Sequence, residues 1–217
     1  MMTQTHMLIG AALFARPDSQ SGARWAGPAA LAGAVAPDLD VFVMWIAERM
    51  AGVSSCVIFR DRFWESPWVE VQAVSNSAPL WALIALIGFL IKGRSVALLA
   101  FGMSGFLHIC GDFLLHADDA RMHLQPFTDW RFYSPVSYWD PRHFGRTVMV
   151  VEAVAGVALV AILWRRFAGG RTRIALGTAF ALYALMAAGA ATSSGEGHDH
   201  DEKCVALPRV VAMFIRV

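Results

Sequence analysis

Residues 95–117 read SVALLAFGMSGFLHICGDFLLHA, an apolar run that carries three ionisable side chains at a fixed spacing. The run is long enough to cross a bilayer, which takes about 20 residues of helix. His108, Asp112 and His116 follow one another at intervals of four, so on a helix with roughly 3.6 residues per turn they share one face. Ionisable groups inside a membrane helix are costly and indicate a functional site. The stretch therefore predicts a membrane helix with one chemically capable face.

The composition of the whole chain agrees with a membrane location. Hydrophobic residues make up 57% of the 217 residues and charged residues 16%, with a mean hydropathy of +0.49. These values lie outside the range of ordinary soluble domains. The net charge of +1 is spread over short loops, which argues against nucleic acid as a partner.

Further apolar runs lie on both sides of the central stretch. Residues 5–15 are too short to cross a bilayer and predict a half-span or a buried helix. Residues 25–51 are long enough, but Pro37 breaks the helix within the sequence Ala-Pro-Asp-Leu-Asp. Three more runs, residues 73–91, 148–164 and 174–191, are also long enough to span.

These runs predict an all-α, polytopic integral membrane helix bundle with about four full spans plus one short N-terminal half-span. We expect the bundle to occupy residues 1–192. Residues 193–217 are expected to form a polar tail with a short apolar C-terminal segment, and the tail includes the alternating run His-Asp-His-Asp-Glu.

Basic residues in the short connections predict the orientation. Short loops rich in Lys and Arg stay in the cytoplasm. Three connections have this character, and they carry Arg16, Arg24, Lys92, Arg94, Arg165, Arg166, Arg171 and Arg173. We therefore expect the connector of residues 52–72, an interfacial loop, and the loop of residues 117–147 on the outer face.

Candidate metal ligands are expected at one depth in this topology. A helical rise of about 1.5 Å per residue places His6 roughly 15 Å above the cytoplasmic turn and Asp38 roughly 20 Å above it. His108 and Asp112 come out at roughly 20 to 25 Å by the same rule. Imidazole and carboxylate groups suit divalent metals, with zinc the first choice and manganese or iron the next. The expected metal ligands are His6, Asp38, Asp40, His108 and Asp112.

Other polar residues are candidates for supporting roles. His116 and His123 are the expected catalytic groups, with His116 as a general base or a further ligand. Second-shell or substrate contacts are expected from Asn76, Asp118, Asp119, Asp129 and Arg131. For Asp118 and Asp119, which lie at the helix end, solvation or pairing with Arg121 explains their presence equally well. Glu152 stays outside the expected site, because facing the polar cluster and reaching towards water both account for it.

These motifs together resemble the YdjM-like family of inner-membrane metal-dependent hydrolases. The resemblance rests on four segments: Thr5-His6 followed by Leu8-Ile9-Gly10, then Pro37-Asp38-Leu39-Asp40, then His108 with Asp112, and finally Pro126-Phe127-Thr128-Asp129-Trp130-Arg131-Phe132. It implies a bacterial inner-membrane location and a metal site, with a distant likeness to zinc-dependent phospholipase C. Many family members have Thr-His-Ser where this chain has Ser75-Asn76-Ser77. The missing imidazole implies fewer metals or weaker binding.

Two functions stay open at this point. The first is a metal-dependent hydrolase of the inner membrane that acts on a lipid-like phosphoester. The second is a non-catalytic membrane protein, either an ion, proton or metal transporter or an accessory subunit, that uses the same polar cluster. Expected partners are membrane lipids and, through small residues on helix faces, a second copy or a membrane-complex partner. These small residues, which suit close helix packing within the chain as well as contacts with a partner, are Ala153, Ala155, Gly156, Ala187, Ala188 and Gly189.

Overall fold

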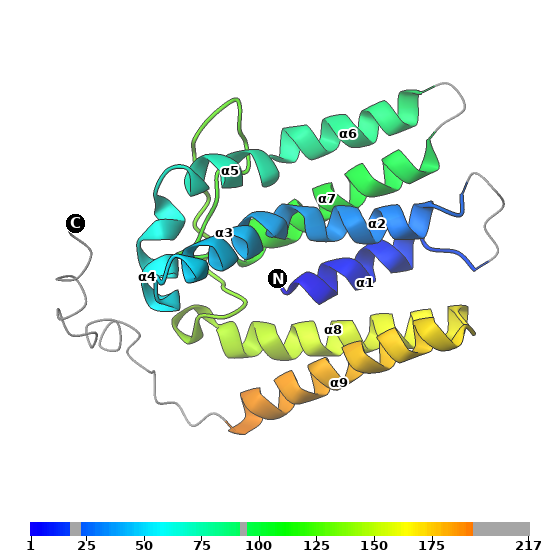
Figure 1. The fold of residues 1–217 in the computed structure, drawn as a ribbon. Helices are drawn as coiled ribbons and strands as arrows, with labels where there is room; N and C mark the ends of the chain where they lie inside the picture. Colours follow the sequence, from blue (N-terminus) through cyan, green and yellow to red (C-terminus); the bar gives the residue numbers. More distant parts are fainter. Residues whose placement is uncertain (18–22, 92–94, 193–217) are drawn as a thin grey trace.

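The computed structural model describes residues 1–17, 23–91 and 95–192, and all regular elements in these ranges are helical. The elements are α1 (Thr3–Phe14), α2 (Ala26–Val35), η1 (Ala36–Asp38), α3 (Leu39–Met50), α4 (Ser55–Arg60), η2 (Arg62–Trp64), α5 (Trp68–Ser75), α6 (Ala78–Leu90), α7 (Val96–Leu115), η3 (Pro141–His143), α8 (Gly145–Arg166) and α9 (Gly170–Thr192). The long helices run side by side (Figure 1). The predicted all-α bundle is confirmed. Lys92, Arg94 and the tail of residues 193–217 lie outside the described residues.

Five helical stretches in the described part of the chain are long and apolar enough to cross a membrane. They are Ala26–Met50, Trp68–Leu90, Val96–Leu115, Gly145–Arg166 and Gly170–Gly189. The predicted polytopic bundle of about four spans is thus confirmed, with five candidate spans among the described residues. The interrupted run of residues 25–51 also has the length of a span, because η1 joins α2 to α3 across the break at Pro37. As predicted, α1 is short, with 12 residues.

Helix α7 lies at the centre and packs against α2, α6 and α1. Glycines bring the backbones of these helices very close together. A Cβ atom on Gly33 of α2 would lie 2.0 Å from the Phe101 carbonyl oxygen, and one on Gly102 of α7 would lie 2.4 Å from the Ala85 nitrogen. Only glycine fits at such contacts, so the sequence of these helices fixes how closely they approach.

Helices α8 and α9 pack against each other and enclose one side of α1. The core between them consists of Leu8, Ala153, Val160, Leu163, Leu176 and Tyr183. A Cβ on Gly156 would lie 2.3 Å from the Tyr183 ring, so this glycine makes room for the tyrosine. Two of the small residues expected to bind a partner, Ala153 and Gly156, thus pack inside the chain.

The two ends of the bundle differ in construction. At one end, α4, α5 and the segment between α7 and α8 lie together, whereas the end of α1, the beginning of α2 and the α8–α9 connection lie at the other end (Figure 1). The connector of residues 52–72 was expected to be a loop, but it contains α4, η2 and part of α5. Ser54 begins α4 by accepting a hydrogen bond from the Val57 amide at 3.3 Å. This separation of ends agrees with the predicted topology, while the outer-face assignment stays a prediction.

Candidate metal centre

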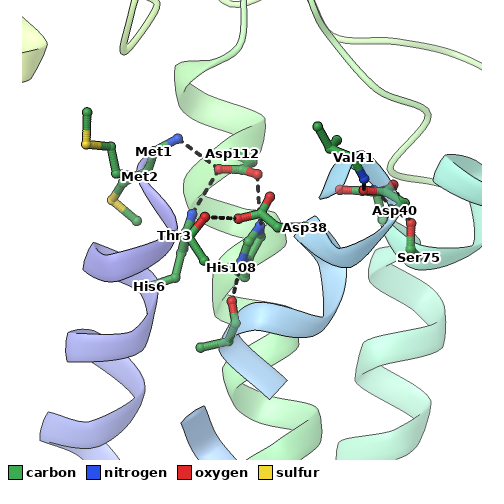
Figure 2. Close-up of polar contacts among 12 residues, drawn as sticks. Met1, Met2, Thr3, His6, Asp38, Asp40, Val41, Ser75, His108 and Asp112 are labelled. Carbon is green, nitrogen blue, oxygen red and sulfur yellow. Dashed lines mark hydrogen bonds and ion pairs between the residues drawn. The ribbon is translucent and has the colours of Figure 1, made fainter. Parts of the chain in front are cut away.

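Polar side chains from three segments meet where α1 begins, where α2 gives way to α3, and near the end of α7 (Figure 2). His6 Nε2 lies 3.0 Å from Asp112 Oδ1, and His108 Nε2 lies 3.0 Å from Asp112 Oδ2. Asp38 Oδ1 lies 3.4 Å from the same His108 nitrogen. His6, His108 and Asp112 each offer one potential metal-ligand atom, and these three atoms lie within 4.8 Å of one another. The four residues that were predicted at one depth are therefore neighbours.

The break at Pro37 explains how Asp38 and His108 come together. Carbonyl groups in the last turn of an α-helix lack an intrahelical partner. Ala34, in the last turn of α2, uses its carbonyl oxygen to accept a hydrogen bond from His108 Nδ1 at 2.7 Å. The 3₁₀ turn that follows directs Asp38 towards the other side of the same imidazole.

This hydrogen bond fixes which nitrogen of His108 carries a proton. A carbonyl oxygen only accepts, so Nδ1 must be protonated. Nε2 then faces two carboxylates, yet it is fully buried and has no hydrogen bond of acceptable geometry among the described residues. A nitrogen lone pair between carboxylate oxygens is repelled unless a cation or a second ring proton lies between them.

The donor set fits a divalent metal ion. Two imidazoles and two carboxylates are ligand types that zinc, manganese and iron accept. The Ala34 carbonyl contact of His108 is the kind of support that orients metal-binding histidines through their other nitrogen. The orphaned Nε2 of His108 points to the place where such an ion would be held.

Other groups around these four side chains complete the cluster. The rings of His6 and His108 are stacked, with their centroids 3.7 Å apart. Thr3 donates its hydroxyl hydrogen to Asp38 Oδ2 at 2.5 Å, and the amino group of Met1 lies 2.9 Å from Asp112 Oδ1. The sequence did not indicate Thr3, because one hydroxyl at a helix start has many ordinary uses.

His116 extends the cluster towards the end of the bundle. Its Nε2 lies 3.5 Å from Asp112 Oδ1 and its Nδ1 lies 2.8 Å from Asp119 Oδ2. Burial lowers the pKa of His116, but the two carboxylates outweigh it and raise the pKa above its ordinary value. His116 thus links the buried Asp112 to Asp119, whose carboxylate is partly exposed.

Asp40 does not join this cluster. Its carboxylate lies on the other side of α3 and accepts hydrogen bonds from Ser75 Oγ at 2.7 Å and from Asn76 Nδ2 at 2.9 Å (Figure 2). Arg121 Nη1 lies 3.3 Å from the same oxygen. Residues two apart on a helix do not face each other, so Asp38 and Asp40 diverge. The structure therefore places Asp40, a predicted ligand, in a buried ion pair.

His123 and Asn76 likewise belong to this second group. His123 Nδ1 lies 3.1 Å from the Asn76 carbonyl oxygen, and its ring lies against Phe113. Burial lowers the pKa of His123 to about 4, so the ring is neutral near pH 7. Asn76 is fully buried and directs its amide group to Asp40. Neither residue makes a described contact with the four clustered side chains.

The remaining candidates lie at the surface. Asp118 pairs with Arg142 at 2.9 Å, and Asp129 is exposed. Arg131 donates to the Ala120 carbonyl oxygen at 3.2 Å and lies over the ring of Trp64. Asp118, Asp129 and Arg131 therefore lie outside the cluster around His108.

A second acidic group is formed by Asp118, Asp140 and His143. Arg142 already lies against both carboxylates, at 2.9 Å from each. Its hydrogen bonds lower the pKa of Asp140 well below the ordinary range, despite an opposing effect of burial. The guanidinium supplies the positive charge here, so this group needs no metal.

Arg121 is a buried charged residue beside the site whose pairing with Asp40 the sequence did not reveal. It is 7% exposed and carries its charge next to Asp40. It follows α7 in an irregular segment, where no periodicity shows which way a side chain points. Its closeness in sequence to Asp118 and Asp119 was the only available signal, and it suggested pairing with those acids and not with Asp40.

Comparison with known proteins gives one match. A family model described as YdjM inner membrane protein matches residues 1–194. No curated protein and no solved structure matches the chain.

Proposed function

The chain belongs to the YdjM inner membrane protein family, and from that premise we propose that this integral inner-membrane protein is a metal-dependent hydrolase. The observation that carries the proposal is the geometry at His108. Its buried Nε2 faces two carboxylates and has no hydrogen bond to any residue that the structure describes, while its Nδ1 donates to the Ala34 carbonyl oxygen. His6, Asp38, His108 and Asp112 would hold one divalent ion, with zinc the first choice.

One ion rather than two agrees with the surroundings of Asp40. Its carboxylate is already paired with Arg121 and accepts two further hydrogen bonds from side chains. A buried carboxylate satisfied in this way has its charge balanced without a metal. The site would therefore use Asp38 but not Asp40.

The chemistry that a divalent ion supplies is to make water acidic enough to ionise near pH 7 and to polarise a phosphoryl oxygen. His116 would accept a proton at Nε2, which faces Asp112, while its Nδ1 lies 2.8 Å from Asp119 Oδ2. Tyr138 packs against the His116 ring, with a centroid distance of 5.2 Å, and limits its rotation.

A phosphoester with a lipid-like part is the substrate class that suits the surroundings. The segment between α7 and α8 exposes aromatic side chains, including Phe127, Trp130 and Tyr133. Aromatic residues are enriched at the membrane–water boundary, where lipid headgroups lie. A substrate at this boundary would be close to the end of the bundle that holds His116.

The test is the metal content of protein purified in detergent without chelators. Wild type is expected to contain about one divalent ion per chain, as a single site requires. Asp112→Asn and His108→Gln are expected to lose it. Asp40→Asn, assayed under conditions where it is still folded, is the matched control, because it neutralises a buried carboxylate only two residues from Asp38 and should keep the ion. Folded wild-type protein without any stoichiometric metal would contradict the proposal.

A second measurement separates enzyme from transporter. Phosphoester lipids in vesicles should release product with wild type and not with Asp112→Asn. If metal is bound but no product appears, and metal-dependent ion flux across vesicles is measured instead, the transport alternative is correct.

A further inference from the structure

Glu152 of α8 makes contacts that join three helices beside the proposed site. The residue is 5% exposed, and its Oε1 accepts hydrogen bonds from the Met2 amide at 2.7 Å and from the Thr5 hydroxyl at 2.6 Å. Thr5 Oγ1 also lies 2.6 Å from the Tyr183 hydroxyl of α9. Because the Thr5 hydrogen goes to Glu152, Tyr183 must donate its own hydrogen to Thr5. The resulting chain runs from α9 through α1 to α8.

The beginning of α1 needs such a partner. The first amide groups of a helix have no acceptor within it, and α1 has no side-chain cap at Met2. In an apolar environment an unsatisfied amide costs several kcal/mol. A carboxylate near a helix N-terminus also interacts favourably with the helix dipole. Glu152 thus supplies from another helix the cap that α1 lacks.

The cap acts on the residue next to His6. Thr5 and His6 are consecutive, so their side chains leave α1 about 100° apart. Thr5 faces α8 and α9, while His6 faces α7, where its Nε2 lies 3.0 Å from Asp112. Holding Thr5 therefore fixes the rotation of α1 about its axis and, with it, the direction of His6.

We propose that Glu152 is a positioning residue that caps α1 from α8 and holds His6 in register with His108 and Asp112. The metal part of this proposal rests on the proposed function, whereas the capping of α1 does not. The surrounding core of Leu8, Ala153 and Tyr183 excludes water, so each hydrogen bond is stronger than it would be at the surface.

A single oxygen of Glu152, Oε1, accepts both hydrogen bonds from α1. Oε2 is buried and has no partner among the described residues, while Oε1 accepts both bonds. Glutamine keeps a carbonyl oxygen at the same distance from the backbone, so Glu152→Gln should preserve the cap. Alanine removes it. Comparing Glu152→Gln with Glu152→Ala therefore tests whether the hydrogen bonds to Oε1, and not the negative charge, hold α1.

The experiment measures Zn²⁺ affinity by chelator competition and amide hydrogen exchange of α1 in detergent-purified full-length protein. Glu152→Ala is expected to weaken Zn²⁺ binding by about 10- to 100-fold, the usual effect of removing a support of a metal ligand. It should also speed exchange in α1 relative to α7. Glu152→Gln should restore both. Glu48→Ala, which removes an acceptor of the Trp68 indole far from α1, should change neither.

Several outcomes would overturn the inference. One is a folded Glu152→Ala protein whose α1 exchange matches that of wild type. Another is a Glu152→Gln protein as impaired as Glu152→Ala, because the cap needs only the retained oxygen. If Glu152→Ala does not fold, Thr5→Val and Thr5→Ser test the same bond, and only the valine variant should loosen α1.

Failure of the proposed function would look different. Wild type would then bind no Zn²⁺, while α1 exchange would still respond to Glu152→Ala. The two proposals can therefore be rejected separately.

Discussion

At the scale of single residues, the two aspartates of the Pro-Asp-Leu-Asp segment have separate tasks. Asp38 faces His108 across the proposed metal position, and Asp40 faces Arg121. Both carboxylates lie inside the bundle, but Asp40 is paired with Arg121, whereas the positive charge beside Asp38 would come from the proposed metal ion. A change at one should therefore leave the other largely unaffected, as long as α2 and α3 keep their path.

The Asp40–Arg121 pair gives a prediction about stability. Arg121→Gln leaves Asp40 buried without its cationic partner, and removing one member of a buried pair costs roughly 3 to 5 kcal/mol. Asp40→Asn leaves the arginine unpaired and should be costly as well. The double variant should be more stable than the sum of the two losses predicts, because neither charge is then unpaired. Unfolding midpoints of the four proteins in detergent measure this coupling, and strictly additive losses would show that the pair does not interact.

The candidate residues could be predicted from the sequence only where regular helix geometry applied. His108, Asp112 and His116 share a face because their spacing matches the helical repeat, and rise per residue placed His6 and Asp38 at their level. The same geometry would have separated Asp38 from Asp40, since residues two apart point in different directions. Arg121 and His123 lie in irregular backbone, where the sequence carries no rule for direction.

At the scale of elements, the break between α2 and α3 is what makes room for the site. Pro37 has no amide hydrogen and cannot continue the α-helix in the ordinary way. The short η1 turn redirects the chain, and Ala34 offers its carbonyl oxygen to His108. The broken span could be predicted from Pro37 and the two acids. Its use as a hydrogen-bond acceptor for a histidine of another helix could not, because that needs the relative placement of α2 and α7.

Replacing this proline should weaken the site while keeping the helix. Pro37→Ala permits a continuous α-helix, in which the Ala34 carbonyl accepts from the amide of residue 38 instead of from His108. Zn²⁺ affinity is then expected to fall by about 10-fold or more, as when other supports of metal-binding histidines are removed. Helix content should not decrease, since alanine favours helix by about 3 kcal/mol over proline. Circular dichroism and chelator competition on the same sample check both, and unchanged Zn²⁺ affinity would mean that the break does not serve the site.

The half-span α1 was also predicted from its length, but its anchoring was not. A helix of 12 residues at membrane depth has exposed amide groups at its start. The sequence showed Glu152 only as a lone carboxylate in another span, and periodicity cannot match an acceptor on one helix to a donor on another. The connector of residues 52–72 was misjudged for a related reason, because its polar and aromatic residues suggested a loop although short helices place them well at the end of the bundle.

At the scale of the whole molecule, glycines set the spacing on which the site depends. Gly33 joins α2, which precedes Asp38, to α7, which carries His108. Gly102 instead joins α7 to α6, which contributes none of the four proposed ligands. Both contacts are too tight for a Cβ atom, but they differ in which helices they hold together. Replacing each glycine by alanine should therefore show whether Zn²⁺ binding depends on the stability of the whole bundle or on the α2–α7 contact.

Alanine at either position should destabilise the protein. A Cβ added at position 33 would lie 2.0 Å from the Phe101 carbonyl oxygen, and one added at position 102 would lie 2.4 Å from the Ala85 nitrogen. Backbone atoms cannot move aside as a side chain can. Overpacking of this kind costs about 1 to 3 kcal/mol or more. Gly177→Ala is the matched control in α9, because a Cβ there meets nothing within 4 Å and alanine favours helix by up to about 1 kcal/mol over glycine. Thermal unfolding in detergent should show losses for the first two variants and none for the third.

Metal binding should then divide the two destabilised variants. In Gly33→Ala, α2 is pushed away from α7, so Asp38 and the Ala34 carbonyl both move away from His108, and Zn²⁺ affinity should fall together with stability. In Gly102→Ala, α6 moves instead, and protein that is still folded well below its unfolding temperature should bind Zn²⁺ almost as wild type does. Chelator competition at such a temperature measures the difference. Equal losses of affinity in both variants would mean that the site depends on the overall tightness of the bundle and not on the α2–α7 contact.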